Sequence, residues 1–183
     1  LQSDSNVRKI SNHITKKVAD KLSTMFKNDR ADFEKKWDDI QVFIQYGMLS
    51  DEKFNEKAKD FLLLKSTEEK YFTFEEYKEK INPNQTDKND RTVILYTHDM
   101  DEHHSLINSA KDKGYDVVVL DGPLSSHYIQ KAEQDFAVSF ARLDADTLDN
   151  IISKDEEIPS KLSKDEEEKI KPIFENISEK EKF

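Results

Sequence analysis

Apolar residues in the first part of the chain recur at the spacing of α-helices. A first helix is predicted over residues 7–26, and its apolar stripe consists of Val7, Ile10, Ile14, Val18, Leu22, Met25 and Phe26. The core face of a second helix would hold Phe33, Trp37, Ile40 and Ile44. Gly47 is well placed to end this helix in a left-handed conformation. Ser50 is a candidate cap for a third helix that carries Phe54, Ala58, Phe61 and Leu62.

A short fourth helix is predicted from residue 74 to about residue 80. Thr73 and Glu76 have the spacing of a capping box, and Phe72 and Tyr77 have that of a hydrophobic staple. The polar residues 82–89, which include Pro83, are typical of a linker. We therefore divide the chain after residue 87.

The hydrophobic pattern changes after this linker. Strand-like runs at residues 92–97, 115–120 and 137–143 alternate with helix-like stretches that begin near residues 101 and 125. Residues 117–120 are continuously apolar, which favours a strand covered on both faces, as in a parallel sheet. This order of strands and helices predicts a small parallel sheet with right-handed crossovers.

Composition excludes several classes of protein. The chain has no cysteine, which rules out disulfides and thiol nucleophiles and fits a reducing compartment. A net charge of −10 argues against nucleic-acid binding, which needs clustered basic surface. Apolar runs are far shorter than the roughly 20 residues that cross a bilayer. Only 3 glycines are present, too few and too scattered for a phosphate-binding glycine loop.

The two ends of the chain indicate how it relates to a complete protein. The chain starts at Leu1, and its last stretch, residues 153–183, is rich in Lys, Glu and Asp. We therefore expect a piece of a longer protein, whose function is shared with other parts.

The histidine-rich stretch at residues 98–104 follows the first predicted strand. Ligands usually bind at the carboxyl ends of strands in open α/β folds, and imidazole and carboxylate groups are metal ligands. The competing interpretation is a solvated, charged loop before a helix. We adopt that interpretation and expect no metal site.

Asp121 ends the second predicted strand and is followed by Gly122 and Pro123. A carboxylate at this position could act as a base or as a Mg²⁺ ligand. The same three residue types are ordinary turn formers, and no partner carboxylate, lysine or nucleophile stands at supporting spacing. The residues alone therefore indicate no complete active site.

Read as a string, the chain resembles the Hsp90 family. The opening Leu-Gln-Ser-Asp-Ser-Asn-Val-Arg-Lys-Ile looks like the segment of the family's middle domain that follows its catalytic loop. Further collinear similarities lie at residues 14–18, 33–37, 44–48, 62–67, 71–77, 93–96 and 113–121. The bacterial branch, HtpG, fits best, and the resemblance covers about residues 1–145.

This resemblance implies part of an ATP-driven chaperone that assists the folding and remodelling of client proteins. Members bind ATP and Mg in an N-terminal domain and pair through a C-terminal dimerisation domain. The implied fold is mixed α/β, with a helical connector at residues 1–87 and a small three-layer α-β-α subdomain with a short parallel sheet at residues 88–152. Residues 153–183 would be a charged linker that leads into the dimerisation domain.

The resemblance implies a catalytic contribution from one residue. The family motif Arg-x-x-Leu-Gln brings an Arg and a Gln to the γ-phosphate of ATP, and Leu1 and Gln2 match its last two positions. The Arg falls before Leu1. The whole protein is therefore expected to be an ATPase that uses Gln2. This chain alone, which lacks the ATP pocket, is expected to be inactive and to bind no cofactor.

Client contact is implied for the helix after the second strand of the subdomain, where Tyr128 and Ile129 align, although both could instead pack on the sheet. The other implied partners are the protein's own N-terminal ATPase domain and C-terminal dimerisation domain, in a cytoplasmic homodimer without nucleic acid or membrane. The alternative function is a self-contained metal- or small-molecule-binding α/β domain that uses the strand ends at His98 and Asp121.

Overall fold

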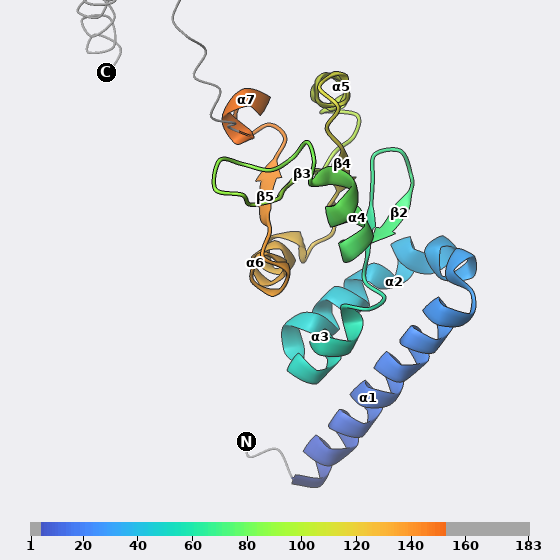
Figure 1. Ribbon diagram of the computed structural model, residues 1–183. Coiled ribbons are helices and arrows are strands. Elements are labelled where there is room, and N and C mark those ends of the chain that lie inside the picture. Colours follow the sequence, from blue (N-terminus) through green and yellow to red (C-terminus); the bar gives the residue numbers. More distant parts are fainter. Residues whose placement is uncertain (1–4, 153–183) are drawn as a thin grey trace, which may run out of the picture.

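Three helices form the N-terminal part of the molecule. The computed structural model describes residues 5–152, and its first elements are α1 (Ser5–Asn28), α2 (Arg30–Ser50) and α3 (Glu52–Ala58). α1 packs on α2 and α3, and Figure 1 shows it extending away from the rest of the molecule towards its N-terminal end. This confirms the predicted helices and shows that the first is longer than the apolar stripe.

The boundaries of α2 and α3 differ from those predicted. α2 continues through Gly47 to Ser50, and the side chain of Asp51, rather than Ser50, caps α3 by accepting a hydrogen bond from the Phe54 amide. Gly47 does not end the helix. It allows close packing, because a Cβ atom at this position would lie 2.7 Å from the ring of Phe54. Its missing side chain lets Phe54 pack directly against the backbone of α2.

A short hairpin connects the helices to the sheet. β1 (Leu63–Lys65) pairs with β2 (Tyr71–Thr73) in antiparallel fashion, an element that the apolar pattern did not predict. α4 (Phe74–Ile81) follows directly. Its capping box is confirmed, since Thr73 and Glu76 each bond the other's backbone amide. The rings of Phe72 and Tyr77, the predicted staple, lie 5.7 Å apart.

The C-terminal part is a three-stranded parallel sheet covered on both faces. The strands are β3 (Val93–Thr97), β4 (Val117–Val119) and β5 (Ser139–Arg142), in the order β4-β3-β5, and both ladders are parallel as predicted. The helices are α5 (His104–Asp112), α6 (Ser125–Phe136) and α7 (Leu148–Ile151). α4 and α6 pack on one face, and α5 and α7 pack on the other (Figure 1).

The larger core joins the helices to the sheet. One cluster of buried side chains runs from Trp37 of α2 through Phe74 of α4 to Ile94 of β3 and Tyr128 of α6. A smaller cluster on the other face contains Leu95, because successive side chains of a strand point to opposite faces. The division after residue 87 stays a prediction, and the larger core crosses it.

An ion pair also joins α2 to α4. The Arg30 guanidinium at the start of α2 donates to both carboxylate oxygens of Glu76 in α4, at 2.5 and 2.7 Å. This contact, aided by the amide of Thr73, lowers the pKa of Glu76 to about 2. A carboxyl whose pKa is lowered on folding stabilises the fold above its unfolded value, near 4.3, and this stabilisation is lost as the pH falls towards 2.

We therefore expect Glu76→Gln to lower the free energy of unfolding by about 1 kcal/mol at pH 7 and by about half as much at pH 3, where the folded-state carboxyl is still mostly ionised. The value is small because the Arg30 and Glu76 side chains are 37% and 43% exposed, so water screens the pair. Urea denaturation of both proteins at the two pH values measures the difference. Glu75→Gln, at an exposed neighbour, is the matched control. A loss that is equal at both pH values would contradict this account.

Candidate functional site

The sequence places Gln2 three residues before α1, outside the described residues. The helix that follows does not bury its whole apolar stripe. In this stripe Leu22 is half-buried, whereas Ile10, Ile14 and Val18 are 61%, 57% and 47% exposed. Ala19, which lies beside the stripe, is fully buried. Among residues 5–152, α2 and α3 lie against the face that carries Ala19 and leave the N-terminal half of the stripe uncovered. The sequence pattern showed the stripe but not which half has a partner.

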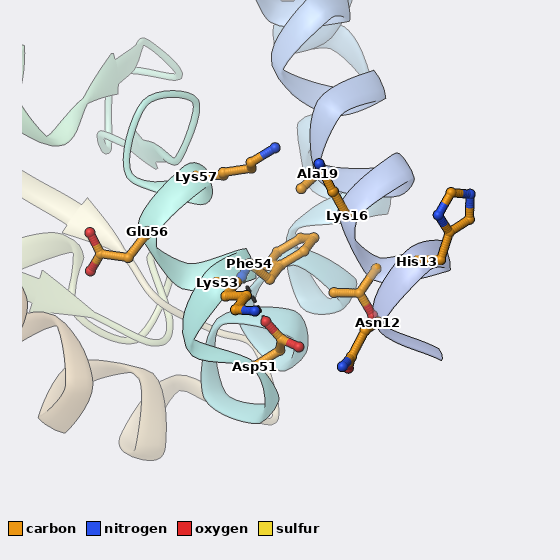
Figure 2. Close-up of a pocket in the computed structure, with 10 residues that line it drawn as sticks. Asn12, His13, Lys16, Ala19, Asp51, Lys53, Phe54, Glu56 and Lys57 are labelled. Carbon is orange, nitrogen blue, oxygen red and sulfur yellow. Dashed lines mark hydrogen bonds between the residues drawn. The ribbon is translucent and has the colours of Figure 1, made fainter. Parts of the chain in front are cut away.

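A groove of about 550 Å³ lies between α1 and α3. Figure 2 shows the ring of Phe54 between the two helices, with Asp51 at the start of α3 and Lys16 on α1. Lys57, on the rim, is paired with Asp20 of α1. The groove therefore has an apolar floor and a rim of mixed charge, and no cluster of like charges marks it as a phosphate site.

A second hollow, of about 230 Å³, lies at the carboxyl ends of the parallel strands. His98 and Asp121, the two strand-end candidates of the sequence, both line it because β3 and β4 are neighbours. Arg142 from β5 and Ile129 from α6 complete its wall. The topology thus brings together residues that are more than twenty positions apart in the chain.

Beside this hollow, three ligand-type side chains converge. One ligand atom from each of His98, Glu102 and His103 lies within 4.8 Å of the others. His103 is only 5% exposed, so the prediction of a solvated loop is wrong for this residue. Asp99 organises the loop, since its carboxylate accepts the backbone amides of Asp101 and Glu102, both at 2.9 Å. These bonds, that of Glu102 foremost, lower the pKa of Asp99.

Tyr128 and Ile129 of α6 differ in exposure. Tyr128 is 1% exposed and packs in the larger core, and burial raises the pKa of its hydroxyl. Ile129 is half-buried and borders the hollow at the strand ends. The position of Tyr128 favours packing on the sheet over direct contact with another protein.

Comparison with known proteins assigns the chain to a family. The family model "Hsp90 protein" matches residues 1–182. This chain belongs to the Hsp90 family. Chaperone protein HtpG of Bacteroides thetaiotaomicron is 47% identical over 175 residues, which cover 95% of this chain and 26% of the relative. HtpG of Porphyromonas gingivalis is 47% identical over 176 residues, again 26% of the relative. The Hsp90 chain thus spans about a quarter of the length of these relatives.

The fold agrees with this assignment. A solved structure of the middle domain of a Plasmodium falciparum heat shock protein superposes on 79% of this Hsp90 chain and 61% of its own chain, with a TM-score of 0.59 at 11% identity. The mixed α/β architecture predicted from the sequence is therefore confirmed. The family match over the whole chain does not favour a self-contained ligand-binding domain. Among the described residues, no helix has an apolar stretch long enough to cross a bilayer.

Sequence reasoning missed the burial of His103 and the exposed half of α1. Neither has a clear local signal. The three histidines at residues 98, 103 and 104 look equivalent in the sequence, and only the chain reversal after β3 separates them. The stripe on α1 is regular throughout, so its pattern carries no information on where the partner helices stop.

Proposed function

We propose that this chain is the later part of the middle domain of an ATP-dependent chaperone that acts on unfolded or partly folded proteins. The observation that carries the proposal is the match to HtpG chaperones over 95% of the chain, together with a middle-domain fold. In the complete protein, ATP and Mg would bind in the N-terminal domain, and the chain would form a cytoplasmic homodimer through its C-terminal domain. This chain alone would not hydrolyse ATP.

The role of α1 in this proposal is mechanical. Gln2 would reach the γ-phosphate of ATP bound by the N-terminal domain and stabilise the charge that develops on transfer. α1 begins three residues later and is anchored on α2 and α3, so it would hold the loop that carries Gln2. Its exposed residues, including Ile10 and Ile14, would pack against another part of the same, roughly fourfold longer protein.

Client contact is proposed for the region of α6. Ile129 borders a hollow and can be reached from outside, whereas Tyr128 supports it from the core. The helical part at residues 1–87 would transmit movement between the loop and this surface. The shared core, which joins α2 to α6 and the sheet, supports such transmission.

The proposal is tested in the complete protein that contains this chain. Gln2→Ala should lower kcat for ATP hydrolysis roughly tenfold or more and leave KM for ATP little changed, because the interaction forms mainly in the transition state. Steady-state hydrolysis at saturating ATP measures the effect. The matched control is Gln134→Ala, at an exposed glutamine of α6. An unchanged kcat in Gln2→Ala would show that Gln2 takes no part in catalysis. Hydrolysis of ATP by this chain alone would contradict the proposal that the ATP pocket lies in the N-terminal domain.

A further inference from the structure

The cluster of His98, Glu102 and His103 has no part in the function proposed above. We propose that these three side chains form a binding site for a divalent transition-metal ion of the zinc type. The site lies at the carboxyl end of the central strand β3, where the chain reverses into α5. Two imidazoles and one carboxylate are a donor set that zinc accepts.

The distances are close to those of a formed site. Nε2 of His98 lies 3.9 Å from a carboxylate oxygen of Glu102, and the three ligand atoms all lie within 4.8 Å of one another. The rings of His98 and His103 meet edge-on, with centroids 5.0 Å apart. Tetrahedral ligands about 2.0–2.1 Å from a zinc ion stand about 3.3 Å from one another. Closing this gap takes about 1 Å of movement.

The side chains that must move are free to do so. His98 and Glu102 are 47% and 66% exposed, whereas His103 is buried and serves as the fixed point. Their backbone is already held in place, because Asp99 accepts the amide of Glu102 and the carbonyl of Asp99 accepts the amide of His103. Metal binding would therefore require side-chain rotation and no refolding of the loop.

Hydrogen bonding orients His103 as a ligand. The Thr97 hydroxyl donates to the carbonyl of Asp99 at 2.9 Å, so it can accept the Nδ1–H of His103 at 2.8 Å. That tautomer leaves the lone pair of Nε2 free to bind a metal ion. Within residues 5–152, Nε2 has no hydrogen-bond partner, and the nearest carboxylate oxygen, on Asp144, lies 3.8 Å away. A fixed tautomer with a buried partner on the other nitrogen is the usual arrangement of a metal-bound histidine.

Asp144 supplies negative charge without being one of the three ligands. It follows β5, and its other oxygen is paired with Arg142. A water molecule would take the fourth position on the metal and could hydrogen-bond to Asp144. Mg²⁺ and Ca²⁺ do not fit this site, because they prefer six or more oxygen ligands. The site would tie the end of β3 to the start of α5.

The test is Zn²⁺ titration of the tag-free 183-residue chain by isothermal calorimetry, with Co²⁺ absorption as a second readout of ligand geometry. We expect one Zn²⁺ per chain. His98→Ala and Glu102→Gln, both at exposed positions, should each weaken binding by about tenfold or more, since the loss of a residue that merely orients a metal ligand already costs that much. Bound Zn²⁺ should also raise the melting temperature of the parent chain.

His104→Ala is the matched control. His104 is the neighbouring exposed histidine, lies outside the cluster and faces Asn108 at 3.3 Å, so its loss should change zinc affinity by less than about twofold. Circular dichroism verifies that each variant is folded. Absence of one-site binding overturns the proposal. So does full affinity in either ligand variant, or an equal loss in His104→Ala, which would indicate adventitious binding to surface histidines.

Discussion

Trp37→Ala should lower the free energy of unfolding by about 3–5 kcal/mol, the largest effect that we expect from one substitution. Trp37 is 1% exposed and belongs to the core cluster that joins α2 to the sheet. Its ring lies 6.1 Å from that of Phe33, and removing it would leave a cavity between rigid helices. Urea denaturation at pH 7, followed by circular dichroism, measures the loss.

Phe43→Ala provides the control for this prediction. Phe43 stands on the same helix, is also aromatic and is 74% exposed, so its removal should change the free energy of unfolding by less than about 0.5 kcal/mol. A small effect of Trp37→Ala, or similar effects of the two substitutions, would show that the core is not organised around α2.

Gly47→Ala should destabilise the protein by about 1–3 kcal/mol, although alanine is the better helix former. The new methyl group would lie 2.7–2.8 Å from ring atoms of Phe54, which is 5% exposed and cannot withdraw without disturbing the core. Gly122→Ala is the control, because a Cβ there meets no atom closer than 3.7 Å and should cost little. Thermal and urea denaturation report the difference.

A double variant decides whether the contact with Phe54 is the cause. In a Phe54→Ala background the clash disappears, so Gly47→Ala should then stabilise the helix by about 0.5–1 kcal/mol. The sign of the effect is expected to reverse. If Gly47→Ala destabilises both backgrounds equally, the glycine is needed for its backbone and not for the space above it.

The sequence predicted those elements that depend on patterns of residues close together in the chain. The capping box of Thr73 and Glu76 fixes the start of α4 whatever surrounds it, and it is formed as expected. The continuously apolar residues 117–120 indicated a strand covered on both faces, and Val117 and Val118 indeed belong to different cores. Both signals involve neighbouring residues, so no knowledge of the tertiary structure was needed.

Features that depend on distant partners were not predictable. Gly47 has the sequence context of a helix end, but the structure places it inside α2, where the ring of Phe54 from the next helix leaves no space for a side chain. His103 is buried because Thr97 and the loop from β5 enclose it, and the sequence does not show that these segments meet. The exposed half of α1 likewise reflects where α2 and α3 happen to end. In each case the deciding contact is long-range.

The one-sided anchoring of α1 has a geometrical consequence. The 24 residues of α1 make a helix about 36 Å long. Other helices cover it at Ala19 and towards its C-terminal end. The arm from Ala19 to Ser5 spans 14 residues, about 21 Å, so a tilt of about 5° at Ala19 moves the start of the helix by roughly 2 Å. A hydrogen bond to a phosphate oxygen does not survive such a displacement. Under the proposed function, Gln2 lies beyond the end of α1 that is farthest from the contacts with α2 and α3. Slight changes at these contacts would then move Gln2 into or out of hydrogen-bonding distance of the nucleotide.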